Sequence, residues 1–436
     1  MTARDNVLPM SDPEVRDLLL SLVGSCQDLR EATARMTEAL LNALMSAQAD
    51  EICGAPWGQR SEARSNSRNG YRERSLSTAA GDLTLRVPKL RHGSYFPEGV
   101  VGRWSRVDAA LAAAVAEMYV NGVATRKVER VAEELGVHGM SKDRVSRIAE
   151  RLDEQVEELR TRPLDASRHC YLWLDATWMR CRVDGASRSQ ALVTAIALDE
   201  QGRKELCGLD LVDTESHDDW RRFLRSLRAR GLSGLQLVVS DACPGLRAAI
   251  EETFVGAAWQ RCTVHLMRDV LGKLHKDDAK ARATELMRAS FGQSDPLVAH
   301  AVLRRAAEAI RADSAAAADC LAGAEADALA FMAFPEAHWP KIRTNNVQER
   351  ANVEIKRRYR QVQCFPSRES LVRLVGAVML EESEAWASKH VFRPESAQRA
   401  WQARPQAVPT ELDLKAADRR AEAIVAGALD RAASKA

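Results

Sequence analysis

The sequence lacks any pair of cysteines at Cys-x-x-Cys spacing, and it lacks any apolar run of about 18 residues. Its nine cysteines are scattered through 436 residues and are odd in number, which argues against a disulfide framework and for reduced thiols. Because no long apolar run is present, we do not expect a membrane span, and the polar, acidic first residues do not resemble a signal peptide. We therefore expect a cytoplasmic protein.

The sequence also lacks a net charge of one sign. Its 63 Lys and Arg residues nearly balance its 61 Asp and Glu residues, so the total charge does not indicate a partner. A hydrophobic content of 46% and a charged content of 28% are ordinary for a globular protein with a large core. The length corresponds to about three domains.

Positive charge is nevertheless concentrated in residues 57–106, where ten Arg and Lys residues face four acidic residues. Glycines and alternating apolar residues predict short strands and turns in this segment. Because the bias has one sign and is mixed with Asn, Ser and Tyr donors, phosphate contact is favoured over a merely solvated basic surface. The candidate DNA-binding residues here are Arg68, Arg72 and Arg74.

Helical patterns lie on both sides of the basic segment. Residues 11–14 form a capping box, and the apolar stripe of the following helix suits packing in its own domain or a dimer contact. Residues 125–135 and 141–159 predict two helices joined by a turn, as in helix-turn-helix motifs, although ordinary helical packing explains them equally well. The outward basic residues of the second helix are Lys142, Arg144 and Arg147.

Two acidic residues occur where apolar patterns predict strands. Asp175 lies within the run 171–178, and Asp241 ends the run 235–241. Burying a lone carboxylate costs several kcal/mol unless a cation or hydrogen-bond donors compensate it. The first interpretation is therefore a shared divalent metal site for phosphodiester chemistry. Taken alone, each acid could instead be satisfied by backbone donors.

The order of elements around these acids favours a particular fold. Residues 171–261 predict a three-stranded meander, a helix, a fourth strand, a second helix and a short fifth strand. Acids on the first and fourth strands match the layout of a ribonuclease H-like core, in which those strands are neighbours. The predicted fold is an α/β catalytic core, with a ribonuclease H-like mixed sheet, a large all-helical insertion and a mainly helical N-terminal DNA-binding region.

Glu349 is the candidate third acid. It belongs to a polar stripe at helical spacing formed by Asn345, Glu349, Asn352, Lys356 and Arg360. Glu354 is a rival third acid, but it lies off this stripe. Cations beside a metal-binding acid suit a nucleic-acid backbone, whereas a solvated basic helix is the alternative. The candidate DNA-binding residues of this helix are Arg350, Lys356, Arg357 and Arg358.

These patterns divide the chain into seven segments. The N-terminal segments are a helical region with a possible dimer contact (1–55), a basic DNA-binding segment (56–107) and a helix-turn-helix-like region (108–162). The later segments are the first part of the core (163–261), the helical insertion (262–340), the final core helices with Glu349 (341–395) and a C-terminal tail (396–436).

An ordered set of motifs between about Arg60 and Arg393 resembles the mutator-type transposases of bacterial insertion sequences. The motifs include Arg68-Asn-Gly-Tyr71, Met118-Tyr-Val-Asn-Gly-Val123, Leu174-Asp-Ala-Thr177, Ser240-Asp-Ala242, Trp259-Gln-Arg-Cys-Thr-Val-His265, Thr344-Asn345 and Glu349-Arg350. The resemblance implies an aspartate–aspartate–glutamate triad that binds Mg²⁺, and the matching positions are Asp175, Asp241 and Glu349. The interval between the second and third acids leaves room for the helical insertion of that family.

The resemblance also implies an activity and partners. The chain would bind the terminal inverted repeats of its element and catalyse Mg²⁺-dependent DNA strand cleavage and strand transfer. Two Mg²⁺ ions are expected, with Mn²⁺ as a substitute. The partners would be double-stranded DNA, as repeats and target, and further copies of the chain in a dimer or larger assembly. In a bacterial cytoplasm the DNA-bound protein would be associated with the nucleoid.

Four residues near the acids are expected to position the site. Cys262 and His265 form a family signature, for which positioning is favoured over a zinc site because no second ligand pair follows. Asn345 and Trp259 are assigned to positioning as well. Trp259 and Trp339 could also stack on a splayed base, although a role in the core is the commoner explanation for such aromatics.

The sequence departs from the family pattern at two places near the acids. Cys243 and Pro244 stand where the family has His and Lys or Arg after Ser-Asp-Ala, and Asn346 stands where it has Pro after Thr-Asn. Two alternatives to a transposase remain. One is a structure-selective nuclease or resolvase with the same core, and the other is a catalytically inactive DNA-binding repressor.

Overall fold

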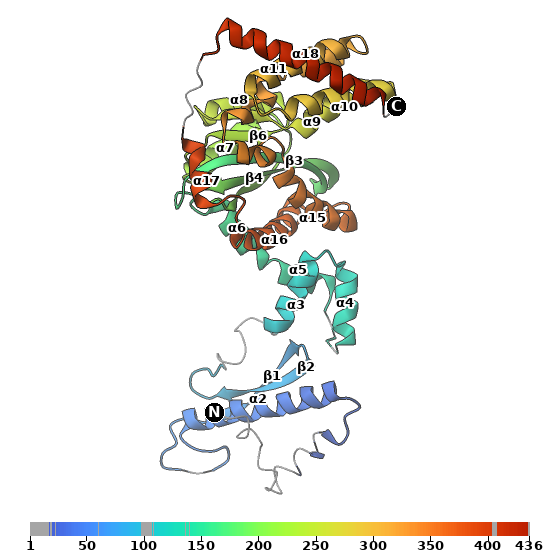
Figure 1. The fold of residues 1–436 in the computed structure, drawn as a ribbon. Coiled ribbons are helices and arrows are strands. Elements are labelled where there is room, and N and C mark those ends of the chain that lie inside the picture. Colours follow the sequence, from blue (N-terminus) through green and yellow to red (C-terminus); the bar gives the residue numbers. More distant parts are fainter. Residues whose placement is uncertain are drawn as a thin grey trace. The chain divides into compact units, whose positions relative to one another are not determined.

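The computed structural model describes residues 17, 20, 21, 23–59, 61–96, 107, 109–135, 137, 138, 140–402 and 408–434. The chain divides into two compact units, Met1–Arg151 and Leu152–Ala436, whose ribbons are drawn in Figure 1. The capping box predicted at 11–14 lies outside the described residues. None of the described helices has the length and apolarity needed to cross a bilayer.

The first unit contains a long helix and a two-stranded antiparallel sheet, namely α2 (Leu29–Cys53), β1 (Arg68–Thr78) and β2 (Gly81–Leu90). The side chain of Asp28 begins α2 by accepting a backbone N–H, and Gly54 ends it in a left-handed conformation. The helix lies beside the hairpin (Figure 1) and packs Met45 against its apolar residues, which are Leu76, Leu83, Leu85 and Val87. The segments predicted as 1–55 and 56–107 therefore share one core.

The described residues of the first unit also form the short helices α3 (Ala109–Val120), α4 (Thr125–Glu134) and α5 (Lys142–Ala149). Ser141 begins α5 by accepting the backbone N–H of Arg144, as the sequence predicts. The helices pack through a common apolar cluster that includes Val128 and Val145. The helix predicted over 141–159 is interrupted after Ala149, and its second half is α6 (Leu152–Thr161) of the second unit.

The second unit is built on a mixed five-stranded sheet of β3 (His169–Val183), β4 (Ala186–Asp199), β5 (Lys204–Val212), β6 (Leu237–Ser240) and β7 (Ala258–Arg261). The strands lie in the order β5-β4-β3-β6-β7. The first three are antiparallel, whereas β6 and β7 run parallel to β3. A two-residue turn at Asp184 and Gly185, both with positive φ, joins β3 to β4. The predicted strand order along the chain and the mixed sheet are confirmed.

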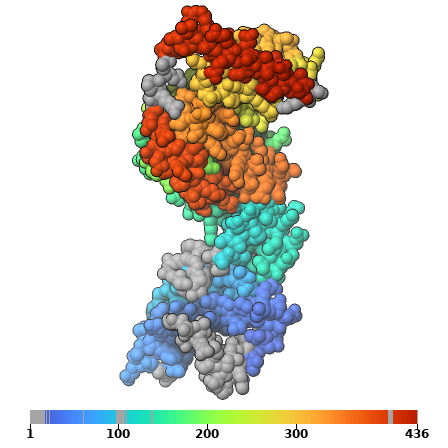
Figure 2. Space-filling view, in the orientation of Figure 1, coloured from blue at the N-terminus to red at the C-terminus, as the bar shows by residue number. Residues whose placement is uncertain are grey.

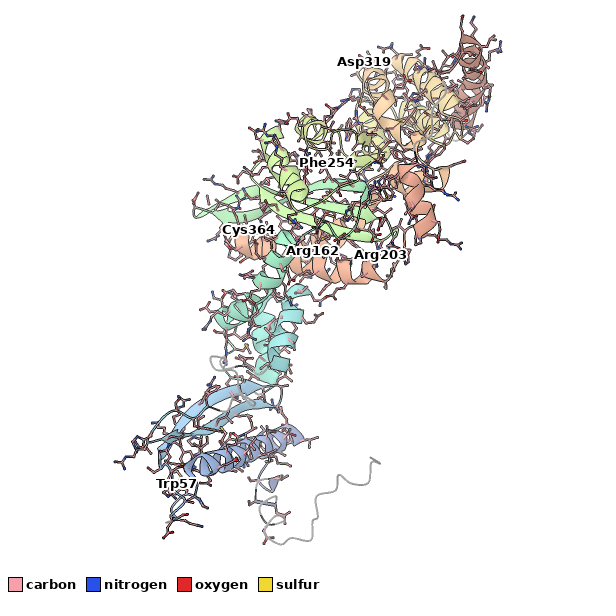
Figure 3. All side chains as sticks on the ribbon, turned by 90° about the vertical axis from the view of Figure 1, so that its left-hand side faces the viewer. Trp57, Arg162, Arg203, Phe254, Asp319 and Cys364 are labelled. Atoms are coloured by element: carbon pink, nitrogen blue, oxygen red, sulfur yellow. The ribbon has the colours of Figure 1, made fainter. Side chains whose placement is uncertain are left out.

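Helices pack on both faces of this sheet. One face is covered by α7 (His217–Ala229) and α8 (Pro244–Thr253). Leu172 and Leu174 of β3 point into this layer, and Phe254, labelled in Figure 3, follows α8 and belongs to the same core. The alternate residues Tyr171 and Trp173 point into a different core, on the opposite face.

That second core is shared with an alanine-rich helical insertion after β7. Its helices are α9 (Thr263–Leu271), α10 (Asp277–Phe291), α11 (Pro296–Arg311), α12 (Ala315–Ala322), α13 (Glu325–Ala328) and α14 (Trp339–Ile342), with 3₁₀ turns η1 (Ala330–Ala333) and η2 (Glu336–His338). Buried alanines such as Ala283 and Ala306 allow these helices to pack closely. These elements occupy the region for which the sequence predicts a helical insertion.

The remaining elements are α15 (Asn346–Val362), α16 (Arg368–Ala387), α17 (Pro394–Gln398), the 3₁₀ turn η3 (Arg399–Trp401) and α18 (Glu411–Ala433). α16 contacts β5 and α6, where Gly376 lies against Val156. The C-terminal helix α18 lies over the insertion (Figure 2) and packs Ala421 into a cluster with Val302. The segment 396–436, predicted only as a tail, thus ends in a packed helix.

Candidate catalytic site

Asp175, on β3, and Asp241, just after β6, occupy equivalent positions along two neighbouring parallel strands. β3 and β6 pair with Trp173 opposite Val239, and Asp175 and Asp241 each follow two residues later. β6 ends at Ser240, and Asp241 begins the turn that leads into α8. The predicted adjacency of the two strands is confirmed. The site therefore concentrates negative charge where β6 ends.

Two asparagines hold the carboxylate of Asp175. Asn345 donates its side-chain amide to Oδ1 at 3.2 Å, and Asn352 donates to Oδ2. Burial raises the pKa of Asp175 to about 6, and the negative charge of Asp241 adds to the rise. The hydrogen bond from Asn352 opposes this rise because it stabilises the charged form. Asp175 is thus a desolvated carboxylate that is oriented by the start of α15.

Gln348 fastens the first turn of α15 to the sheet. Its side-chain amide donates to the carbonyls of Trp173 at 2.8 Å and Thr194 at 3.2 Å, and its oxygen accepts the Thr194 hydroxyl at 3.0 Å. The sequence interpretation missed this residue. A signal was present, because Gln348 lies three residues after Asn345 and four before Asn352, which places all three amides on adjacent turns of one face.

Glu349 leaves α15 on the side that faces the first acid. It lies four residues after Asn345 and three before Asn352, so the three side chains share a face of the helix. The Glu349 side chain is 40% exposed and forms a 3.7 Å ion pair with Arg268 of α9. The rival acid Glu354 is instead engaged by cations of its own helix, the nearest at 2.5 Å. This geometry favours Glu349 as the third acid.

His265 and Cys262 lie beside Asp241. Nδ1 of His265 contacts Oδ1 of Asp241, and this carboxylate, followed by Cys262, raises the pKa of His265 to about 10. The buried Sγ of Cys262 also accepts the backbone N–H of Asn345 at 3.3 Å. One ligand atom from each of Asp241, Cys262 and His265 lies within 4.8 Å of the others, which is close enough to hold a metal ion. The cluster links the second acid to the start of α15.

A fourth carboxylate, Glu215, lies near Asp241 and was missed by the sequence interpretation. Glu215 lies in the turn before α7, and burial together with the charge of Asp241 raises its pKa. Gly245 of α8 packs tightly against this turn, because an added Cβ would lie 2.8 Å from the backbone N of His217 and 3.1 Å from the Glu215 carbonyl oxygen. No local spacing marks Glu215, since it approaches Asp241 only in the folded sheet.

The basic residues predicted on α15 differ in exposure. The exposed ones are Arg350, Lys356 and Arg357. The side chain of Arg358 is only 7% exposed and pairs with Glu354 at 2.5 Å and with Glu381 at 3.3 Å. The prediction of a DNA contact for Arg358 is therefore corrected, because its charge is neutralised within the unit.

The basic candidates of the first unit also differ. The exposed ones are Arg72, Lys142 and Arg147. Arg74 and Arg144 are half-buried. The side chain of Arg68 is only 3% exposed, pairs with Asp50 and donates to the Ser46 carbonyl at 2.5 Å. Arg68 therefore braces β1 against α2, and its predicted DNA contact is corrected.

The two tryptophans considered for base stacking are engaged by the protein. Trp339 is 8% exposed and donates its indole N–H to the Phe334 carbonyl at 2.8 Å, which agrees with the favoured core role and leaves no free face for a base. Trp259 donates to the Ser240 hydroxyl at 2.9 Å and lies under the guanidinium of Arg247. Its contacts support the end of β6, next to the second acid.

The departures from the family pattern fit the local structure. Pro244 occupies the first turn of α8 after Cys243, a position at which helices accept proline. Asn346 is the exposed first residue of α15. None of these residues replaces a side chain that holds Asp175.

Comparison with known proteins identifies relatives of this chain. Residues 17–389 match the family model described as Transposase, Mutator family. The transposase for insertion sequence element IS1081 of Mycobacterium tuberculosis is 41% identical over 362 residues, which cover 82% of this chain and 87% of that protein. The transposase for insertion sequence element IS256 in transposon Tn4001 of Staphylococcus aureus is 34% identical over 359 residues, which cover 82% and 91%.

A solved structure, the Drosophila P element transposase strand transfer complex, aligns with 76% of this chain and 93% of that one. The sequence identity is 13% and the TM-score is 0.28, so this likeness supports no conclusion about the fold. The family match and the identity to the bacterial proteins both extend over most of the chain. The chain therefore belongs to the Mutator family of transposases.

Proposed function

We propose that this chain is the transposase of an insertion sequence, which binds the terminal inverted repeats, cleaves a strand at each end and joins it to target DNA. The observation that carries the proposal is the adjacency of Asp175, on β3, and Asp241, just after the neighbouring parallel strand β6, with Glu349 on a helix fastened to β3. Acids gathered from three separate segments contribute little to packing and suit phosphodiester chemistry.

The second unit is proposed to be a ribonuclease H-like core. Three antiparallel strands followed by two parallel ones, in the order β5-β4-β3-β6-β7, support this assignment. The first acid lies on the first strand, β3, and the second follows the end of the fourth strand, β6, which is the neighbour of β3 in the sheet. The third follows the helical insertion, on a helix that packs back against β3.

The donor set of the site suits Mg²⁺. Carboxylate oxygens are hard ligands for metal ions. The raised pKa of Asp175 indicates that its hydrogen bonds and the nearby cations do not fully offset burial and the negative charge of Asp241. Asp175, Asp241 and Glu349 would hold the metal, for which Mn²⁺ would substitute. When bound, two such ions stabilise the charge that develops on the attacking and leaving oxygens.

The surrounding residues orient the acids for two successive displacements. Asn345 and Asn352 fix the carboxylate of Asp175, while His265 offsets charge at Asp241. Water attacks the phosphodiester at the end of the element, the P–O3′ bond breaks, and a 3′-hydroxyl is released. That hydroxyl then attacks a target phosphodiester. Because the two nucleophiles are water and the 3′-hydroxyl, no covalent protein–DNA intermediate is required.

Exposed cations would bind the DNA backbone. Those on the helix of the third acid are Arg350, Lys356 and Arg357, and those in the first unit are Arg72, Lys142 and Arg147. Phosphate contacts of this kind position DNA without reading its sequence. Two element ends must be processed together, so we also propose that the chain acts as a dimer or larger assembly.

The test uses purified protein, Mg²⁺ and a labelled duplex that carries the repeats flanking the gene. The expected result is metal-dependent nicking at the repeat boundary, which is lost in Asp241→Asn and Glu349→Gln. Glu354→Gln is the matched control for the third acid and should retain nicking. Binding without nicking in Mg²⁺ or Mn²⁺ would contradict a catalytic role and indicate a repressor. Cleavage of branched DNA without repeats would indicate a structure-selective nuclease.

A further inference from the structure

Trp178 is an exposed tryptophan in the strand that carries the first acid. Its side chain is 48% exposed, although Thr177 and Met179 on either side are buried. Every other tryptophan that the structure describes in the second unit is buried or half-buried. From Trp178 on, β3 alternates exposed and buried residues, and Arg180 and Arg182 are exposed on the same face. A large aromatic ring left in water on this face points to a binding role.

The ring of Trp178 is held from its edge. The indole N–H donates to Oε1 of Glu215 at 2.7 Å. The backbone of Glu215 is itself fixed by its close contact with Gly245. Since the N–H is already satisfied, the ring offers its π face to a ligand rather than a hydrogen bond. Holding the ring in one orientation reduces the conformational entropy that binding would lose.

Trp178 lies where β3 continues beyond the end of β6. The pairing of these strands ends with Trp173 opposite Val239, and Trp178 is five residues further along. It follows Asp175 by three residues, which corresponds to about 10 Å along a strand. Its partner Glu215 lies close enough to Asp241 for the two charges to interact. Because three residues is an odd offset, Trp178 leaves β3 on the face opposite to Asp175, and it approaches the acids around the end of β6, through Glu215 and Asp241. Along this route the ring is within a few nucleotides of any phosphodiester held at the acids.

We propose that Trp178 stacks on an unpaired nucleobase next to the cleaved phosphodiester and thereby fixes the position of that strand. This inference rests on the proposed function, because it requires DNA at the acids. Aromatic faces accept any base, so stacking would hold the nucleotide without reading its identity. The exposed cations of α15 would hold the phosphates while the ring holds the base.

The first experiment measures stacking without cleavage, in Ca²⁺ instead of Mg²⁺. Repeat duplexes carry 2-aminopurine at single positions around the cleavage boundary, because its fluorescence rises on leaving the base stack and falls again against an indole. We expect one position to be quenched by the wild type, to brighten several-fold with Trp178→Leu, and to stay partly quenched with Trp178→Phe. Trp57→Leu removes a comparably exposed tryptophan of the first unit and should leave this signal unchanged.

The second experiment measures nicking in Mg²⁺. Trp178→Leu should nick the intact duplex roughly 10-fold more slowly, as expected for the loss of one stacked base. An abasic nucleotide at the quenched position should restore much of that rate, because no base then needs to be held. Glu215→Ala should weaken the quench and Glu215→Gln, which keeps an acceptor, should preserve it.

Two outcomes would overturn the inference. One is equal fluorescence of the wild type and Trp178→Leu at every position of 2-aminopurine. The other is an abasic substrate that restores none of the nicking rate of Trp178→Leu. Both outcomes require that Trp178→Leu has the same Tm as the wild type. Failure of the proposed function is a separate result, since it appears as absent Mg²⁺-dependent nicking by the wild type. Stacking is read in Ca²⁺ and does not depend on that activity.

Discussion

The side-chain amide of Asn352 donates to Oδ2 of Asp175, so α15, the helix of Glu349, is tied directly to β3. Asn345 makes a second tie to Oδ1. The whole helical insertion separates β7 from α15 along the chain. Connectivity therefore does not place Glu349, and these side-chain contacts set its position.

Replacing Asn352 by Ala should lower the nicking rate at neutral pH roughly 10-fold to 100-fold, as expected for losing a hydrogen bond to a charged group. The variant also removes a donor that lowers the pKa of Asp175, so the acid limb of the pH–rate profile should move to higher pH. Nicking rates across pH and repeat binding would be measured together. Val353→Ala, an exposed position on the same helix, is the control. An acid limb that does not move would contradict the proposed role of Asn352.

The pKa of Asp175, about 6 against an ordinary 3.8, predicts a pH-dependent effect of Mg²⁺. Between these values the folded protein binds more protons than the unfolded chain, so the stability from this group is present below pH 4 and is lost as pH rises through 6. Mg²⁺ should favour the ionised site and therefore raise Tm more at about pH 7.5 than at about pH 5. Thermal unfolding in Mg²⁺ and in EDTA measures this difference. Equal increases at both pH values, or an undiminished increase in Asp175→Asn, would contradict the assignment.

The strands of the second unit could be predicted because their signals are local. The apolar runs and the turn at Asp184 and Gly185 specify β3 and β4 without distant contacts. The end of α5 could not be predicted in the same way, because the apolar spacing continues through Val156 into the next helix. Tertiary contacts assign that helix to the second unit, among them the packing of Val156 against Gly376 of α16 and the ion pair of Arg160 with Asp210.

The closeness of Asp175 and Asp241 could be predicted because a carboxylate inside an apolar strand requires compensation, and the strands that bring the two acids together are neighbours. The residues around them were harder to identify. Gln348 and Glu215 acquire their roles from backbone groups and charges that are distant in sequence. Arg68 and Arg358 resemble solvent-exposed cations in the sequence, and only their folded partners show that they are buried.

Gly245→Ala should destabilise the second unit and displace the Glu215 turn. The new Cβ would lie 2.8 Å from a backbone N and 3.1 Å from a carbonyl oxygen, and neither can move independently of the chain. The expected loss is about 1–3 kcal/mol in the free energy of unfolding, typical of overpacking, with slower nicking. Gly427→Ala in α18 has no backbone neighbour within 4 Å and should instead stabilise its helix by about 0.5–1 kcal/mol. Urea unfolding of both variants checks the contrast, and equal effects would refute the tight contact.

His338 should make the second unit less stable in mild acid. It is buried, with Nδ1 2.7 Å from the Tyr171 hydroxyl and Nε2 2.9 Å from the Ser396 hydroxyl. Burial, together with the positive charge of Arg399, lowers its pKa to about 4. Because the unfolded chain then binds more protons between pH 6.5 and 4, stability falls as pH drops through this window. The loss by pH 4 is on the order of 3 kcal/mol.

The test of His338 must separate it from Asp175, whose titration acts in the opposite direction over an overlapping pH range. Urea unfolding at about pH 7 and about pH 5 should therefore compare the wild type with His338→Gln. At the higher pH the variant should be less stable than the wild type, because glutamine does not reproduce the hydrogen bonds of His338 to the two hydroxyls. On acidification the variant should lose less stability than the wild type. The contribution of Asp175 is the same in both proteins and cancels in this comparison. His390→Gln, at an exposed histidine, should behave like the wild type. If His338→Gln kept the full acid sensitivity of the wild type, that sensitivity would have to arise from other groups.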